Sequence, residues 1–139
     1  MLVLDTDHVS ALGFSSASSV ELLERLDASG QSTATTIVTV EEQLRGWLAE
    51  IHRLTEPHRN IIAYGRLQHL IEFFAAWNVL PWNADAADLF VRFRRQGVRI
   101  GSMDLKIACI VLANDAILLT RNATDFAQVP ELRIENWLD

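Results

Sequence analysis

The chain alternates between short apolar runs and longer segments whose apolar residues recur at helical spacing. Five short runs predict buried strands, at residues 2–5, 34–39, 77–82, 116–120 and 132–137. Helical spacing predicts helices near residues 18–28, 40–54, 57–76, 84–96 and 103–114. Strands and helices in alternation indicate an α/β fold, with a central twisted parallel β-sheet flanked by helices on both faces.

Composition adds that this fold is one domain. The 139 residues are 50% hydrophobic and 22% charged, and they include no repeat, low-complexity segment or linker. We therefore expect a single domain over residues 1–139 that buries its own core. The lone Cys109 lies in the apolar run "KIACIVLA", which suits a core thiol in a reducing compartment. With no 18-residue apolar run and no signal-like N-terminus, we expect a cytoplasmic chain without a membrane segment.

Polar side chains follow several predicted strands at the point where each strand ends. Asp5 ends the first strand, and Asp104 lies in the first turn of the helix before the fourth. Others follow the second and fourth strands: Thr39, Glu41, Glu42, Asn122 and Asp125. Ligands of open parallel sheets bind beyond the carboxyl ends of the strands. Four separate segments could thus each bring a carboxylate to one place.

Each of these residues also has a purely structural interpretation. Asp7, and less so Asp5, suits the cap of a short helix over "HVSAL". Glu41, Glu42 and Asp104 suit the positive end of a helix dipole. Asn122 and Asp125 are common turn residues.

Together, however, the carboxylates indicate a metal. Carboxylates within about 4–6 Å of one another repel unless a cation lies between them. Oxygen ligands favour Mg²⁺ or Mn²⁺. The histidines, His8, His52, His58 and His69, lack zinc-site spacing, and neither a GxSxG elbow nor a GxxxxGK loop is present.

Four segments, in order and over nearly the whole chain, resemble a PIN-domain ribonuclease of the VapC toxin type. They are "LDTDHVSAL" (4–12), "TVEEQLRGW" (39–47), "IGSMDLKIACIVLANDAILLTRNATDF" (100–126) and "RIENWLD" (133–139). The acidic positions of the family pattern match Asp5, Glu42, Asp104 and Asp125. Asp7 stands where the family commonly has Asn, and the choice of Glu42 over Glu41 rests on the resemblance.

The resemblance implies a Mg²⁺-dependent (or Mn²⁺-dependent) endoribonuclease, the toxin of a toxin–antitoxin pair, with the four matched carboxylates as metal ligands. Two bound divalent cations, four positive charges together, would bring the formal charge from −6 to −2. The resemblance also implies an RNA substrate, a small antitoxin whose helix occupies an apolar groove, and a homodimer. Side chains that could orient the ligands or waters, or add charge to the site, are Thr6, Asp7, Ser102, Thr120 and Asn122.

The arginine run "RFRRQGVR" (92–99) has two interpretations. It could hold the RNA backbone beside the site, or it could be the solvated face of a helix. Arg94 and Arg95 are the residues of this run least committed to packing, so they are the candidates for RNA contact.

Two other functions fit parts of the sequence. "DTDHV" matches the nucleophile motif of haloacid-dehalogenase-type phosphatases, with Asp5 as nucleophile and Asp7 as acid. That mechanism needs a separate lysine, whereas the only lysine, Lys106, follows Asp104 by two residues. A non-catalytic PIN-like interaction module would keep the carboxylates as surface charge, and metal-dependent RNA cleavage would distinguish it from a nuclease.

Overall fold

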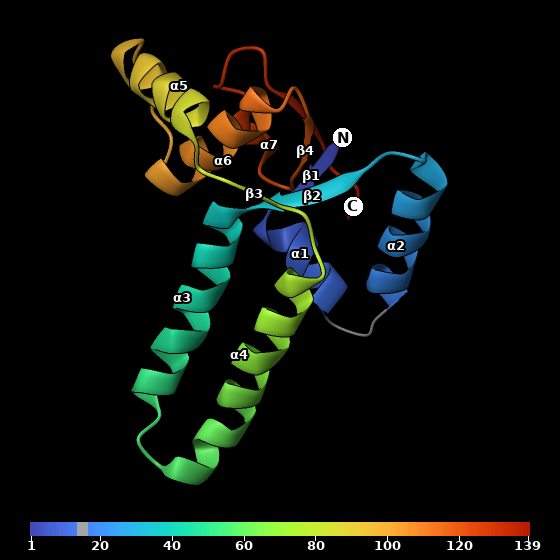
Figure 1. Cartoon of the computed structure of the whole chain (residues 1–139), viewed down its shortest axis with the longest axis vertical. Coiled ribbons are helices and arrows are strands. Elements are labelled where there is room, and N and C mark those ends of the chain that lie inside the picture. Colours follow the sequence, from blue (N-terminus) through green and yellow to red (C-terminus); the bar gives the residue numbers. More distant parts are fainter. Residues whose placement is uncertain (14–16) are drawn as a thin grey trace.

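A parallel five-stranded sheet forms the centre of the computed structural model, which describes residues 1–13 and 17–139 (Figure 1). Its strand order is β3-β2-β1-β4-β5. The strands are β1 (Leu2–Leu4), β2 (Thr33–Thr36), β3 (Val79–Leu80), β4 (Ile117–Leu119) and β5 (Arg133–Glu135). All neighbouring pairs are parallel, so every strand ends at the same edge of the sheet.

Helices cover both faces of this sheet, as the sequence predicts. They are α1 (Thr6–Gly13), α2 (Ala17–Ser29), α3 (Ile37–Arg53), α4 (Asn60–Ala75), α5 (Ala84–Arg95), α6 (Ser102–Ala113) and the short α7 (Ala123–Phe126), with a 3₁₀ turn η1 (Pro57–Arg59) before α4. In Figure 1, α5, α6 and α7 lie on one side of the sheet and α1 to α4 on the other. Helices α3 and α4 form a long hairpin that projects away from the strands.

Alternating side chains of the central strands form two cores, one on each face. Val3 and Leu118 pack with residues of α6 such as Ile107, while Leu4 and Leu119 pack against the α1, α2 and α4 side. The middle of α6 is buried all round, including Cys109, whose thiol pKa burial raises to about 11. The thiol thus lies in the core, as expected. Among the described residues, none of the helices combines the length and the apolar character that a membrane span requires.

The second strand is shorter than predicted. We expected a strand over residues 34–39, but β2 ends at Thr36, whose side chain accepts a hydrogen bond of 3.1 Å from the Thr39 amide. This contact caps α3, so Ile37 to Thr39 form its first turn. The β-branched run hides the helix start, because its hydrophobicity suits a buried strand equally well. The four-residue α7 was not predicted, since one turn has no periodicity.

Candidate active site

Asp5 is fixed at the end of β1 by hydrogen bonds on both sides. Its backbone N–H donates to the Leu119 carbonyl over 3.1 Å, which ties it to β4. Its Oδ1 lies 3.2 Å from the His8 backbone N–H and 3.2 Å from His8 Nδ1. Asp5 therefore caps α1 and is buried, whereas Asp7, the cap favoured from the sequence, is exposed.

Glu42 extends from α3 toward α1. Its Oε2 accepts a hydrogen bond of 3.1 Å from Thr6 Oγ1, while its buried Oε1 has no hydrogen-bond partner among the described residues. Burial raises the pKa of Glu42, and the nearby Asp104 and Asp5 carboxylates raise it further. The adjacent Glu41 is exposed and pairs with Arg45. Glu42, and not Glu41, therefore faces the other carboxylates.

Asp104 and Asp125 meet at the side chain of Asn122. Asn122 Nδ2 lies 3.4 Å from Asp104 Oδ2 and 3.1 Å from Asp125 Oδ2, so the amide donates toward both carboxylates. Asp104 is in the first turn of α6, and Asp125 is in α7, which follows β4. Burial raises the pKa of Asp104, and repulsion from Asp125 and Asp5 adds to the rise. Asn122 thus connects the first turn of α6 with α7.

The four predicted carboxylates lie at the edge where the parallel strands end, near enough for several of them to repel one another. Glu42 and Asp104 each feel the charge of Asp5, and Asp104 also feels Asp125 and, more weakly, Asp7. Glu42 and Asp104 line one open groove between α3 and α6. In residues 1–13 and 17–139, no three Asp, Glu, His or Cys side chains are arranged so that they could hold a metal ion as they stand. The carboxylates are therefore spread along this edge and do not surround one point. They include Glu42 Oε1, which has no hydrogen-bond partner among the described residues, and the pKa is raised at both Glu42 and Asp104.

The other predicted side chains differ in what they contact. Thr6 and Asn122 donate hydrogen bonds from their side chains to carboxylates. Thr120 Oγ1 instead accepts a hydrogen bond of 3.0 Å from the backbone N–H of Asn122, within the turn. Ser102 Oγ lies 3.4 Å from Arg94 Nη2. Asp7 contributes only charge at a distance.

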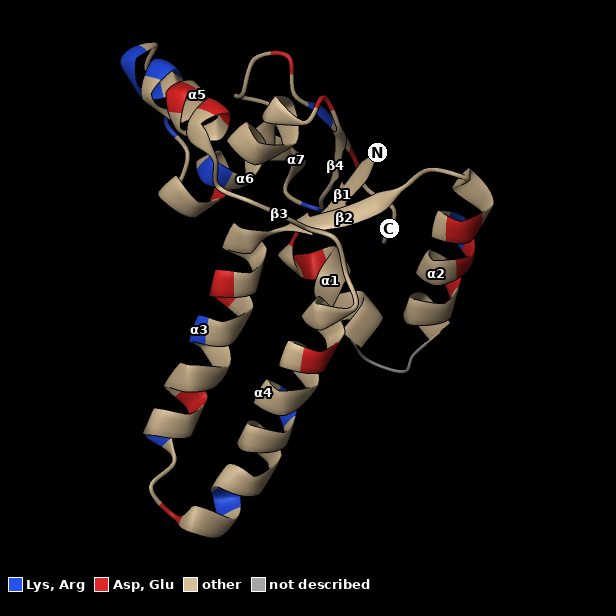
Figure 2. Cartoon of the chain, viewed as in Figure 1, with Lys and Arg blue, Asp and Glu red and all other residues tan. Residues whose placement is uncertain are grey.

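Arg94 is more committed to the fold than the sequence suggested. Its Nη1 donates to the Val98 carbonyl over 2.9 Å, and its guanidinium lies over the Phe90 ring at 5.2 Å. Arg94 is therefore not among the arginines of this run least committed to packing, because the helix ends and the chain turns back under its side chain. Arg95 is exposed, and Figure 2 shows the basic residues of α5 gathered at the end of that helix.

Lys106 does not join the carboxylates as a phosphatase lysine would. Its Nζ lies 5.8 Å from the centre of the Trp82 ring. With Asp7 exposed as well, the arrangement does not favour the dehalogenase-type mechanism.

Sequence reasoning missed His8. This side chain is completely buried and contacts both Asp5 and the backbone amide of Trp137, 129 positions away. The available signal was a histidine three residues after the strand-ending aspartate, where it can reach back to the helix cap. The partner at Trp137 is visible only in three dimensions.

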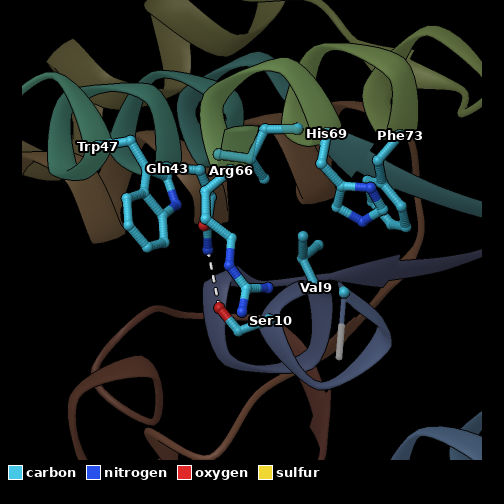
Figure 3. A pocket seen from close by; sticks show the side chains of 9 residues that line it. Val9, Ser10, Gln43, Trp47, Arg66, His69 and Phe73 are labelled. Carbon is cyan, nitrogen blue, oxygen red and sulfur yellow. Dashed lines mark hydrogen bonds between the residues drawn. The ribbon is translucent and has the colours of Figure 1, made fainter. Parts of the chain in front are cut away.

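A small pocket lies between α1 and the α3–α4 hairpin and is lined by both apolar and polar side chains. Figure 3 shows Val9, Trp47 and Phe73 around it, with Gln43 donating a hydrogen bond of 2.9 Å to Ser10. Gln43 and Trp47 also line the neighbouring hollow that contains Glu42. Trp47 is only partly buried and borders this pocket. The two hollows therefore share Gln43 and Trp47 as lining residues.

Comparisons with known proteins agree with this architecture. No family model matches the chain. The chain is similar to "Ribonuclease VapC2" of Rickettsia felis, 38% identical over 50 residues, which are 36% of this chain and 37% of that protein. This match thus spans little more than a third of the relative's length. "Ribonuclease VapC2" of Haemophilus influenzae is 26% identical over 123 residues, 86% of each chain.

Among solved structures, VapBC-1 from nontypeable Haemophilus influenzae has a similar fold. The TM-score is 0.77, with 21% identity over 99% of this chain and 98% of that one. Nearly every element of the present chain is therefore matched in order. These findings confirm the resemblance seen in the sequence, and the chain has the fold of the VapC-type PIN-domain proteins.

Proposed function

We propose that this chain is a metal-dependent endoribonuclease, the toxin of a toxin–antitoxin pair that acts in the cytoplasm. The observation that supports it most directly is the buried, unpaired Glu42 Oε1 among carboxylates that repel one another. A buried carboxylate oxygen without a donor costs free energy unless a cation or water satisfies it. The relatives named ribonucleases supply the substrate class.

The donor set suits Mg²⁺ or Mn²⁺, because all four candidate ligands are carboxylates. Asp5, Glu42, Asp104 and Asp125 would hold the metal. When bound, the metal supplies an activated water and polarises the phosphodiester. The metal's positive charge would also offset the net charge of −6, which otherwise repels RNA.

The chain's own residues then have distinct tasks. Thr6 holds one oxygen of Glu42 and leaves the other available, and Asn122 keeps Asp104 and Asp125 side by side. Asp5 is held by the strand before it and the helix after it. Rigid supports of this kind fix ligands in the geometry that the chemistry needs.

The decisive experiment incubates the purified chain with total RNA in Mg²⁺ or chelator and sequences the new ends. Asp5→Asn is the sharpest variant, because Asn caps a helix as well as Asp but removes the charge. We expect cleavage by the parent in Mg²⁺ only, and a loss of at least about a hundredfold in Asp5→Asn. Asp115→Asn, an exposed position with φ of 48° that Asn tolerates, is the matched control. Metal-independent cleavage, or equal cleavage by both variants, would refute the proposal.

The partners follow from the same resemblance. We expect an antitoxin helix over the open hollow that Trp47 and Glu42 line, and a homodimer of this chain. We expect a small protein to co-purify with the chain and to suppress RNA cleavage. This protein should no longer co-purify with the Trp47→Arg variant. Light scattering of the purified chain tests the dimer. A partner that binds without suppressing cleavage would place the antitoxin elsewhere.

A further inference from the structure

His8 lies between the candidate site and the C-terminal segment, with no exposed surface. Its Nδ1 is 3.2 Å from Asp5 Oδ1, and its Nε2 is 3.2 Å from the Trp137 backbone nitrogen. Both ring nitrogens are therefore used inside the protein. Neither is available to a metal or to substrate.

The Trp137 contact determines where the imidazole proton resides. A backbone N–H can only donate, so Nε2 must accept with its lone pair and carry no proton. The neutral ring then carries its proton on Nδ1, which donates to Asp5 Oδ1. A doubly protonated ring would place the Nε2 proton against the Trp137 N–H.

The side chain of Trp137 fixes the position of its backbone amide. Its indole Nε1 donates to Glu135 Oε2 over 3.1 Å, and the Arg25 guanidinium lies 4.3 Å from the ring centre. These contacts tie the C-terminal segment to β5 and α2. The acceptor side of His8 is therefore fixed by elements outside the site.

At Asp5, two donors converge on the same oxygen. Oδ1 accepts from the His8 backbone N–H and from His8 Nδ1. Two donors on one oxygen fix the rotation of the carboxylate, so Oδ2 is the oxygen left for the cluster.

We infer that His8 is a positioning residue for Asp5, held in its Nδ1-protonated form by the Trp137 amide of the C-terminal segment. The inference rests on the proposed function only in taking Asp5 as a metal ligand. Hydrogen-bonded supports of metal ligands contribute about 10- to 100-fold to affinity or activity.

The first test uses the unmodified chain without metal or RNA. Long-range ¹H–¹⁵N spectra of the histidine side chains distinguish the two neutral tautomers from the imidazolium. We expect His8 with a protonated Nδ1 and a bare Nε2 at neutral pH. A protonated Nε2 in either form would overturn the inference.

The second test compares two substitutions that each keep one half of His8. In His8→Asn the side-chain amide takes the place of Nδ1 and can still donate to Asp5. In His8→Gln the longer side chain can accept from Trp137 but offers no donor at that place. Three-bond couplings should report a single Asp5 χ1 rotamer in the parent and in His8→Asn, and averaging in His8→Gln.

Mn²⁺ binding by electron paramagnetic resonance should follow the same order. We expect His8→Asn within about threefold of the parent and His8→Gln weaker by about 10-fold or more. Equal effects in both variants, with matched thermal stability, would show that His8 only fills space and would refute the inference. If the parent neither binds Mn²⁺ nor cleaves RNA, the proposed function fails, while the tautomer and the Asp5 rotamer still decide the role of His8.

Discussion

Thr6 Oγ1 donates a hydrogen bond of 3.1 Å to Glu42 Oε2, and this contact joins the helix after β1 to the helix after β2. The two strands are neighbours in the sheet, so the helices that follow them start side by side. The hydroxyl satisfies one oxygen of a half-buried carboxylate and leaves the other, Oε1, without a partner. The contact therefore sets which oxygen of Glu42 is open to a ligand.

Removing the Thr6 hydroxyl should raise the pKa of Glu42 further. The hydrogen bond favours the ionised carboxylate and opposes the rise caused by burial and by Asp104. Thr6→Val keeps the shape and removes the donor, whereas Thr6→Ser keeps the donor and serves as the control. A pH titration of the Glu42 side-chain carbonyl ¹³C signal measures the effect. An unchanged pKa in Thr6→Val would show that the contact has no energetic role.

Asn122 should stabilise the carboxylate pair that it contacts. Asn122→Leu keeps a similar volume but removes the amide that donates toward Asp104 and Asp125. We expect a higher pKa for Asp104 and a loss of about 1 kcal/mol in unfolding free energy at neutral pH in chelator. Denaturant unfolding measures the loss. It should shrink as the pH falls and Asp104 takes up its proton, and a pH-independent loss would indicate a packing effect instead.

The fold was largely predictable because its strands and helices differ in the period of their apolar residues. The central strands lie between helical segments and are largely buried on both faces, which gives short continuous runs such as "LVL". The limits of β2 were not predictable, because Thr36 caps a helix through a contact that the β-branched run conceals.

The site was predictable only in part. The carboxyl ends of parallel strands meet, so the gathering of Asp5 and Asp104 follows from topology. The side-chain contacts do not follow from topology. Helical periodicity does not choose between Glu41 and Glu42; the resemblance favoured Glu42, and the hydrogen bond from Thr6 accounts for that choice physically. His8 escaped notice because its second partner is contributed by the far end of the chain.

Arg94 and Arg95 should separate stability from RNA binding. Arg94 donates to the Val98 carbonyl and packs on Phe90, so Arg94→Ala should lower the unfolding free energy by about 1–2 kcal/mol. Arg95 is exposed, and Arg95→Ala should change the unfolding free energy by less than about 0.5 kcal/mol.

If Arg95 contacts an RNA phosphate, Arg95→Ala should weaken RNA binding even though it barely changes stability. Measured in an Asp5→Asn background to prevent cleavage, Arg95→Ala should reduce the slope of log affinity against log salt by about 0.7, the value for one contact to single-stranded RNA. Filter binding over a salt series gives this slope. An unchanged slope would return Arg95 to the solvated face of α5.

Asp104→Asn should make the metal-free protein more stable. Because the folded pKa of Asp104 is raised, the native state binds its proton more tightly than the unfolded chain does. Stability is therefore lost as the pH rises from the ordinary value of 3.8 through the raised pKa, and the full penalty persists above it. Asn removes the charge, so in chelator at neutral pH the variant should melt above the parent, and the difference should vanish at acidic pH.

Mg²⁺ should reverse this order, because a ligand that binds only the native state adds stability in proportion to its affinity. At 100 times its dissociation constant it adds about 2.7 kcal/mol to the parent, and it should add much less to Asp104→Asn. Thermal melts in chelator and in Mg²⁺ measure both effects in one series. Asp115→Asn, the same change at an exposed carboxylate, should follow the parent in both buffers. If Asp104→Asn melts below the parent in chelator and gains as much from Mg²⁺, Asp104 stabilises its helix and binds no metal.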